Sequence, residues 1–205
     1  MGISCSGVIL AGGRNSRFGG REKAFLPLGD RLLFERIYGV CRPLFDDLIL
    51  VTNNPAAYLS WDLQIVTDLF AVRSSLTGIH AGLFYASNPY IFVVACDVPF
   101  LRAEIVSCVL ESIDERFDAI MPDTSKGREP LCAAYARRCL PAVERSLSRD
   151  HLKIQRVFGP KRIRTIPEKR LRRIDPQLVS FFNINTSEDL ATAERLLAVS
   201  DMEGC

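Results

Sequence analysis

The sequence predicts an α/β fold in which helices cover both faces of a mostly parallel sheet. Short, continuous apolar segments alternate with helical patterns along the chain, and Tyr90–Ala95 (YIFVVA) is the clearest of these segments. Strands that are apolar throughout are typical of parallel sheets whose two faces are both buried. The N-terminal unit agrees, because apolar Gly7–Leu10 leads into a glycine-rich loop and then into a helical pattern.

After that first strand, the N-terminal part is expected to form a helix and two further strands. Leu28–Val40 is the expected helix. Leu48–Thr52 (LILVT) is a second buried strand, which ends at the polar sequence Asn53-Asn54-Pro55. Leu63–Val66 is a third strand, and it ends at Thr67-Asp68.

The middle of the chain continues the alternation. Ile79–Ala86 is expected to be a helix, and Thr77-Gly78 precedes it. The strand Tyr90–Ala95 stops at Cys96-Asp97-Val98-Pro99, and Ala103–Ile113 has the spacing of an amphipathic helix.

The next segments predict a strand, a polar loop, a strand and a helix. Asp118–Met121 is a short strand, and the loop Asp123–Glu129 follows it. Leu131–Ala136 is the next strand, and Pro141–Leu147 begins a helix.

The last third of the chain has a different character. Lys161–Arg173 holds seven basic residues and one acid, which is typical of a solvated edge strand and is also compatible with a phosphate or partner site. A final helix is expected at Glu188–Val199. Thr186 is its predicted N-cap, and Asp189, three residues later, completes a capping box.

Composition indicates an ordinary globular protein, and we expect one domain over residues 1–205. A net charge of only +2 gives no reason to expect a nucleic-acid partner. Seven irregularly spaced cysteines without a C-x-x-C pair disfavour a disulfide framework or a zinc site and suit a reducing compartment. We see no signal peptide and no apolar segment long enough to span a membrane, so the expected location is cytoplasmic.

Polar or glycine residues follow four of the predicted strands. They are the glycine loop, Asn53, Asp68 and Asp97. Ligands of open α/β sheets bind beyond the carboxyl ends of the strands, so these positions predict one shared site.

The glycine loop predicts a polyphosphate site. It joins a strand to a helix, contains Arg17 and ends at Lys23, so backbone N–H groups and cations face one small volume. Neither the dinucleotide pattern G-x-G-x-x-G nor the pattern G-x-x-x-x-G-K-[ST] fits it, which disfavours a dehydrogenase. Asp97 at the end of a buried strand is well placed for Mg²⁺, although it could instead cap the following helix.

The loop resembles the signature L-A-G-G-x-x-x-R-(M/F)-G-G-x-(D/E)-K of the MobA-like nucleotidyltransferases. Leu10, Ala11, Gly12, Gly13, Arg17, Gly19 and Lys23 fall on it at its spacing. The resemblance continues through Thr77-Gly78, Asp97, Pro130-Leu131 and Asn183-Ile184-Asn185-Thr186, although Ser74-Ser75 stands where relatives often have Gly-Pro. It implies a three-layer α/β/α, Rossmann-like nucleotidyltransferase fold, with nucleotide binding in the N-terminal part and second-substrate binding in the C-terminal part.

The resemblance also implies an activity and a set of site residues. The activity is transfer of GMP from GTP to the terminal phosphate of molybdopterin, with Mg²⁺ as cofactor, and a protein that delivers molybdopterin or receives the product is a further partner to consider. The implied catalytic residues are Lys23, Arg17 and Asp97, with Asp97 as the metal ligand. The implied binding residues are Leu10, Ala11, Gly12, Gly13, Lys23, Asn53, Asp68, Gly78, Asp97, Asn183 and Asn185.

The resemblance implies that Asn183 and Asn185 lie on the molybdopterin side. Side chains two apart in an extended segment share a face, and two amides side by side can hydrogen-bond a pterin-like edge. Helix capping is the alternative explanation of that motif. Two other functions stay open at this point: a sister enzyme that uses CTP or a sugar phosphate, and a non-catalytic nucleotide-binding module. His80 lies in an apolar helix and is expected to be a packed side chain.

Overall fold

The computed structural model describes residues 3–12 and 22–203, with only the backbone described for 200–203. β1 (Cys5–Leu10) lies at the centre of the main sheet, between β4 (Leu48–Val51) and β6 (Tyr90–Ala95), and is parallel to both. β5 (Gln64–Val66) extends the parallel part of the sheet beyond β4. β1, β4 and β6 are almost entirely buried, which explains their continuous apolar sequences, whereas the short β5 is buried only at Val66.

The other half of the sheet is mixed. β9 (Cys132–Ala136) runs antiparallel between β6 and β7 (Ala119–Thr124). β10 (Ile163–Pro167) is parallel to β7 and forms the edge of the sheet. The strand at Leu131–Ala136 was therefore predicted correctly as a strand, and the basic segment does contain an edge strand.

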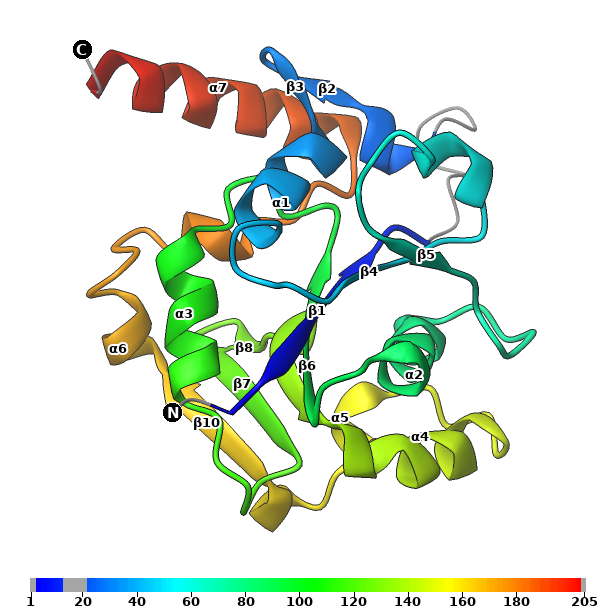
Figure 1. Cartoon of the computed structure of the whole chain (residues 1–205). Helices are drawn as coiled ribbons and strands as arrows, with labels where there is room; N and C mark the ends of the chain where they lie inside the picture. Colours follow the sequence, from blue (N-terminus) through cyan, green and yellow to red (C-terminus); the bar gives the residue numbers. More distant parts are fainter. Residues whose placement is uncertain (1–2, 13–21, 204–205) are drawn as a thin grey trace.

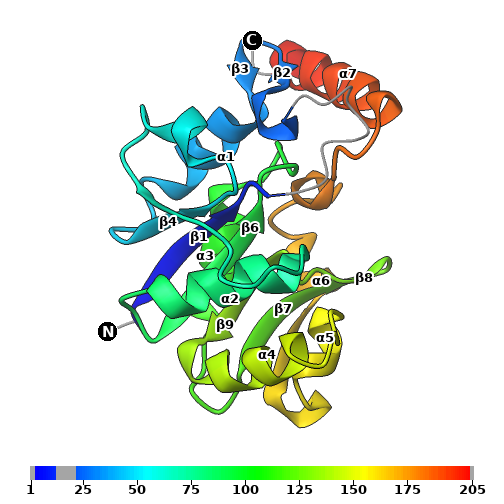
Figure 2. The same cartoon turned by 90° about the vertical axis from the view of Figure 1, so that its right-hand side faces the viewer.

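Helices cover both faces of the sheet and make three layers, as predicted (Figures 1 and 2). One face carries α1 (Leu33–Cys41) and α3 (Ala103–Glu111). The opposite face carries α2 (Ser75–Tyr85), α4 (Leu140–Leu147) and the short α5 (Ile154–Val157). Among the described residues, no helix has both the length and the apolar character needed to cross a membrane.

The C-terminal helix α7 (Ser187–Glu203) lies beside a small hairpin near the N-terminus rather than over the main sheet (Figure 1). A separate hydrophobic cluster joins the two, with Leu28, Leu33, Ile184 and Ala193 at its buried centre. The predicted capping box begins the helix: the Asp189 N–H donates to Thr186 Oγ1 over 3.1 Å, and the Thr186 N–H donates to Asp189 Oδ2 over 2.8 Å.

The predicted helix Leu28–Val40 was wrong over its first turn. Gly29 has a left-handed backbone (φ +62°), so the chain turns there and pairs β2 (Pro27–Leu28) with β3 (Arg31–Leu32). The helix begins only afterwards, where Glu35 accepts a 2.8 Å hydrogen bond from the Leu32 N–H and satisfies an otherwise free donor.

The predicted loop Asp123–Glu129 was also wrong in part. β7 continues to Thr124 and pairs antiparallel with β8 (Gly127–Arg128), so this segment is a hairpin. Gly127 supplies the positive φ (+112°) that the tight turn needs. α6 (Glu168–Leu171) follows β10 directly, so the basic segment Lys161–Arg173 is part strand and part helix.

Candidate active site

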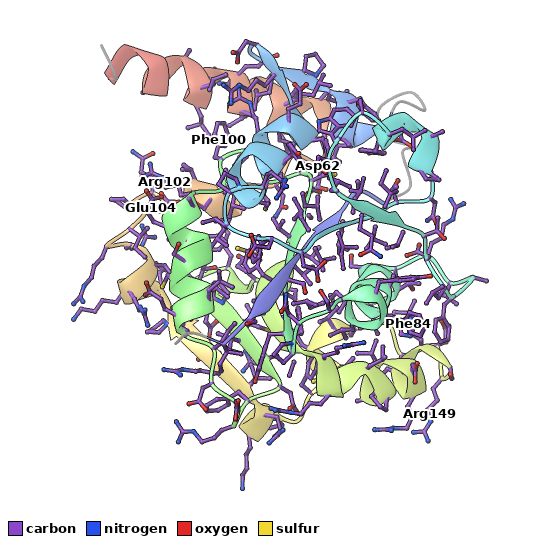
Figure 3. The ribbon with its side chains drawn as sticks, in the orientation of Figure 1. Asp62, Phe84, Phe100, Arg102, Glu104 and Arg149 are labelled. Carbon is purple, nitrogen blue, oxygen red and sulfur yellow. The ribbon has the colours of Figure 1, made fainter. Side chains whose placement is uncertain are left out.

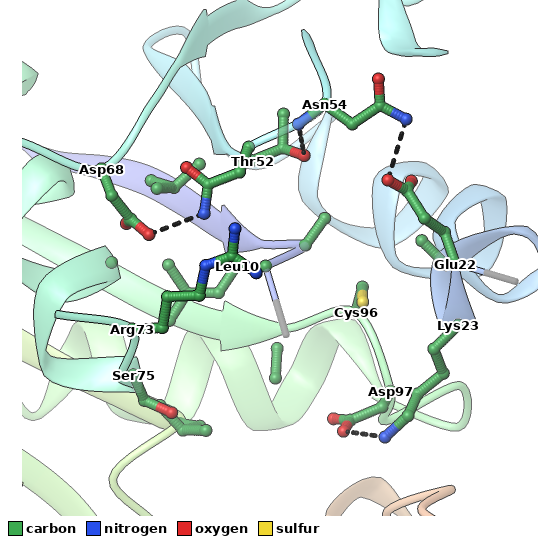
Figure 4. A pocket seen from close by; sticks show the side chains of 18 of the residues that line it. Leu10, Glu22, Lys23, Thr52, Asn54, Asp68, Arg73, Ser75, Cys96 and Asp97 are labelled. Atoms are coloured by element: carbon green, nitrogen blue, oxygen red, sulfur yellow. Dashed lines mark hydrogen bonds and ion pairs between the residues drawn. The ribbon is translucent and has the colours of Figure 1, made fainter. Parts of the chain in front are cut away.

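A pocket opens at the carboxyl edge of the parallel strands. The strand registers pair Leu10 with both Ala95 and Val51, and Val51 with Val66, so β1, β4, β5 and β6 end at one level. The chain runs outward from β1 to β4 and β5 and then returns to the other side of β1 as β6. Such a switch point is where open α/β sheets bind ligands, and here it holds a cavity of about 730 Å³ (Figure 4).

The structure brings most of the predicted site residues to this cavity. Those that line it are Leu10, Ala11, Gly12, Lys23, Asn53, Asp68, Gly78, Asp97 and Asn185. Asn183 is exposed and is not among the lining residues, while Gly13 and Arg17 lie outside the described residues. The side chains that we did not assign from the sequence include Glu22, Thr52, Asn54, Arg73, Ser74, Ser75 and Cys96.

One end of the pocket is organised by Lys23. Its Nζ donates to Asp97 Oδ2 over 2.9 Å and to Asn185 Oδ1 over 3.0 Å. The lysine begins a short 3-10 helix (Lys23–Phe25), Asp97 lies two residues past β6, and Asn185 precedes α7. A further hydrogen bond, from the Ile184 N–H to the Asp97 carbonyl oxygen over 2.9 Å, joins the segment before α7 to the segment after β6. One cation therefore joins three distant parts of the chain.

The second oxygen of Asp97 is available for a metal ion. Oδ1 is buried and has no hydrogen-bond partner among the described residues. A buried carboxylate oxygen without a hydrogen-bond partner lowers the stability of the folded state, and such an oxygen is a suitable ligand for a hard divalent cation. Within residues 3–12 and 22–203, no group of three or more His, Cys, Asp or Glu side chains could hold a metal ion.

The other end of the pocket holds a second carboxylate. Asn53 Nδ2 donates to Asp68 Oδ2 over 2.9 Å, so the ends of β4 and β5 are connected there. Figure 4 shows Asp68 on the opposite side of the cavity from Lys23 and Asp97, with Arg73 beside it. The pocket thus has a Lys23–Asp97 end and an Asp68–Arg73 end.

Gly78 lies where the first turn of α2 passes close to β1. A Cβ at this position would meet Leu10 Cδ2 at 3.0 Å, tighter than ordinary van der Waals contact. The glycine therefore lets the helix approach Leu10 at the edge of the pocket, and a ligand contact need not be its only role.

Glu22, the residue directly before Lys23, is held in place by two hydrogen bonds. Its two carboxylate oxygens accept from Asn54 Nδ2 over 2.9 Å and from the Tyr58 hydroxyl over 3.3 Å. These contacts anchor the segment from which Lys23 reaches Asp97. No sequence pattern indicated this cluster, although Glu22 directly precedes the lysine of the loop signature.

The described pocket offers no activated nucleophile. Burial, reinforced by the negative charge of Asp97, raises the pKa of the Cys96 thiol to about 12, so the sulfur stays protonated. His80 lies away from the pocket lining, is 2% exposed and contacts Glu144 at 3.3 Å, as expected of a packed side chain. The site instead supplies charges and hydrogen-bond groups to a bound ligand.

An open α/β sheet with a charged pocket at its switch point places the protein among the doubly wound α/β proteins, many of which bind nucleotides there. Residues 7–165 of the chain match the family model described as the MobA-like NTP transferase domain. The chain belongs to this family of nucleotidyltransferases, and the resemblance seen in the sequence is confirmed.

Individual relatives agree with the family model. The molybdenum cofactor guanylyltransferase of Desulfosudis oleivorans is 47% identical over 92% of this chain and 94% of its own length. A probable molybdenum cofactor guanylyltransferase of Pelotomaculum thermopropionicum is 35% identical over 98% and 97%. The crystal structure of molybdopterin-guanine dinucleotide biosynthesis protein A from Archaeoglobus fulgidus superposes with a TM-score of 0.80 at 30% identity, covering 94% of this chain and 98% of that one.

Proposed function

We propose that the protein transfers GMP from GTP to the terminal phosphate of molybdopterin, releasing pyrophosphate. The observation that carries the proposal is the ammonium group of Lys23, which lies within 3.0 Å of both Asp97 and Asn185. Lys23 thus lies between the Asp97 carboxylate at a strand end and the Asn185 side-chain amide from the C-terminal part of the chain. This position suits a point where a triphosphate meets a second substrate. The relatives named as guanylyltransferases of the molybdenum cofactor supply the identity of both substrates.

The reaction needs positioning and charge neutralisation more than covalent chemistry. The terminal phosphate of molybdopterin attacks the α-phosphorus of GTP in line, the bond to the β-phosphate breaks, and pyrophosphate leaves with the bonding electrons. A phosphate nucleophile is already anionic at neutral pH, so no strong general base is required. Binding both substrates in one pocket removes much of the entropy barrier to their reaction.

Lys23 and Arg17 are proposed to offset the negative charge that grows on the leaving pyrophosphate. Gly12 borders the cavity without a Cβ, so the backbone can approach the triphosphate closely. Gly13 is assigned the same role by the loop signature. Asn53, Asp68 and the cavity-lining Leu10, Ala11 and Gly78 are proposed to surround the nucleoside.

Nucleotidyltransferases of this family usually need a divalent metal ion. We propose that the ion here is Mg²⁺ and that Asp97 holds it, since Oδ1 is buried and lacks a partner among the residues described. When bound, the ion would neutralise phosphate charge. Lys23 Nζ would then exchange its contact with Asp97 for the phosphates.

Asn183 and Asn185 are proposed to bind molybdopterin. Asn185 lines the cavity, and Asn183 is exposed two residues before it, with the fully buried Ile184 between them. The Ile184 side chain is buried in the small cluster beneath α7, so the two asparagines that flank it lie on the side away from that cluster. This arrangement supports a second-substrate surface that begins at Asn185 and continues outside the nucleotide pocket.

Thermal unfolding with nucleotide and Mg²⁺ tests the proposal directly. A ligand at about 100 times its Kd stabilises a protein by about 2.7 kcal/mol. For a chain of this length that corresponds to a rise in Tm of roughly 5–10 °C. GTP should produce this rise and CTP should not, and a pyrophosphate-release assay with molybdopterin should then show turnover only with GTP.

The contrary results separate the alternatives. A rise with CTP alone would assign the protein to the cytidylyltransferases. A rise with GTP but no pyrophosphate release in the presence of molybdopterin would leave a nucleotide-binding module. An Asp97→Asn variant should eliminate turnover and provides the background rate for the assay.

A further inference from the structure

Arg73 is a cation in the pocket that no part of the loop signature or of the strand-end pattern predicted. It lines the cavity, is exposed, and makes neither a hydrogen bond nor an ion pair with any residue in the described part of the chain. Figure 4 shows its side chain at the same end of the pocket as Asp68, away from Lys23 and Asp97. A guanidinium group that lies in a binding pocket without a protein partner is free to bind ligand.

The backbone on both sides of Arg73 is held firmly. Thr77 Oγ1 donates to the Val72 carbonyl oxygen over 2.7 Å, and Ser74 Oγ accepts from the Thr77 N–H over 3.2 Å as the N-cap of α2. These bonds bracket Arg73 between Val72 and Ser74, so its Cα has a fixed position at the rim of the pocket.

The neighbouring Asp68 is oriented as well. Asn53 donates to Oδ2 of Asp68 over 2.9 Å, and Oδ1 accepts no hydrogen bond from a residue that the structure describes. This end of the pocket therefore presents a carboxylate that accepts hydrogen bonds beside a guanidinium group that donates them. A triphosphate would be repelled by Asp68, whereas a base with donors on one edge and acceptors on the next would satisfy both groups.

Guanine has this pattern. Its N1–H and N2–H₂ groups are donors on one edge, and O6 and N7 are acceptors on the adjacent edge. Adenine places the N6–H₂ donor where guanine has O6, and cytosine has the N4–H₂ donor and no N7. Arginine binding to O6 and N7 with two hydrogen bonds is the commonest specific contact to guanine in nucleic-acid complexes.

We infer that Arg73 is a specificity-determining residue, which donates to O6 and N7 of the guanine of GTP while Asp68 accepts from N1–H and N2–H₂. The inference rests on the proposed function and adds the residue that selects guanine over other bases. It also explains how a chain with Ser74-Ser75 in place of the usual Gly-Pro recognises the base, since the recognition group lies one residue earlier.

Nucleotide analogues test the assignment atom by atom. Equilibrium binding is measured by calorimetry with Mg²⁺ for GTP, for 7-deaza-GTP, which lacks the N7 acceptor, and for ITP, which lacks the N2 amino group. The wild-type protein should bind 7-deaza-GTP and ITP each about tenfold more weakly than GTP, the scale of one specific base contact.

Replacing Arg73 with alanine should reduce the ratio of the Kd for 7-deaza-GTP to the Kd for GTP to about one. The ratio of the Kd for ITP to the Kd for GTP should stay unchanged, because ITP lacks the N2 amino group that donates to Asp68. Arg149→Ala is the matched control. Arg149 is an exposed arginine just beyond α4, it forms no ion pair with a residue that the structure describes, and it is not a lining residue of the pocket (Figure 3). This control should keep both ratios at their wild-type values.

Two results would overturn the role of Arg73 and leave the proposed function intact. One is a 7-deaza-GTP ratio that Arg73→Ala leaves unchanged. The other is an equal loss of affinity for all nucleotides, ATP included, which would make Arg73 a phosphate contact. If the wild-type protein bound no guanine nucleotide at all, the proposed function itself would fail, so the two failures are distinguishable.

Discussion

Replacing Lys23 with methionine tests the arrangement at the centre of the pocket. Methionine keeps the length and apolar stem of lysine but removes the ammonium group, which donates to Asp97 over 2.9 Å and to Asn185 over 3.0 Å. The variant therefore loses two hydrogen bonds and the charge proposed to stabilise the departing pyrophosphate. It leaves both oxygens of the Asp97 carboxylate without a partner among the residues described.

The expected effects on stability and on rate differ in size. The lysine and aspartate side chains are 22% and 20% exposed, so their contact is partly desolvated. Leaving such a carboxylate unpaired costs about 1–3 kcal/mol, which lowers Tm by roughly 2–4 °C for each kcal/mol. Loss of one preorganised electrostatic contact should lower kcat by roughly 10²–10³-fold.

The assay combines thermal unfolding with single-turnover pyrophosphate release at saturating GTP. Lys161→Met is the matched control, because Lys161 is exposed and forms no ion pair with a described residue, and it should leave both measurements unchanged. If Lys23→Met weakened GTP binding but kept the wild-type kcat, Lys23 would act in binding alone, and the role assigned to it in the transition state would be refuted.

Three further predictions concern other parts of the molecule. Asp97→Ala should abolish Mg²⁺-dependent pyrophosphate release, and near-normal turnover would contradict its role as the metal ligand. Asn183→Ala should leave the Kd for GTP unchanged and raise the Kd for molybdopterin; the reverse result would reassign the motif. Arg162, whose Nε donates to Asp118 over 2.8 Å, keeps the pKa of that carboxyl below its ordinary value. The stabilisation is therefore present above about pH 4 and is lost as the pH falls further, so in urea unfolding Asp118→Asn should lose less stability than wild type between pH 6 and pH 3. Equal losses in the two proteins would contradict this.

The strand ends explain why much of the pocket could be predicted from the sequence. Asn53, Asp68 and Asp97 each follow an apolar strand, and the carboxyl ends of parallel strands meet at one edge of a sheet. In the structure these three residues line one cavity. Their proximity follows from a local pattern combined with a general rule of topology.

The contacts across the pocket could not be predicted in the same way. Lys23 reaches Asp97 and Asn185, which lie 74 and 162 positions further along the chain, and no local pattern encodes such a pairing. Arg73 had no signal, because an exposed arginine before a helix is usually solvated. The direction of β9 could not be derived either, since an apolar segment of five residues suits both parallel and antiparallel strands.

Turn geometry accounts for two of the errors in element boundaries. Gly29-Asp30 and Gly127 both carry a turn signal, and each interrupts a segment that was predicted as a single element. Glycine at these positions permits a backbone that other residues rarely adopt, so the chain reverses and forms a hairpin. The Gly29-Asp30 dipeptide could have revealed the first hairpin. A third error is the helix expected at Ile79–Ala86, which begins at Ser75 because Ser74 is its N-cap.

The long reach of Lys23 has a consequence for the order in which the protein can mature. β1 and Lys23 are synthesised early, but Asn185 is added 162 residues later. During translation the strand ends can assemble while the amide that completes the site is still missing. Contacts so far apart in sequence form late and slowly, because the loop between them must close first. The parallel strands β1, β4, β5 and β6 can therefore pair before Asn185 is added, whereas the contact between Lys23 and Asn185 can form only near the end of synthesis.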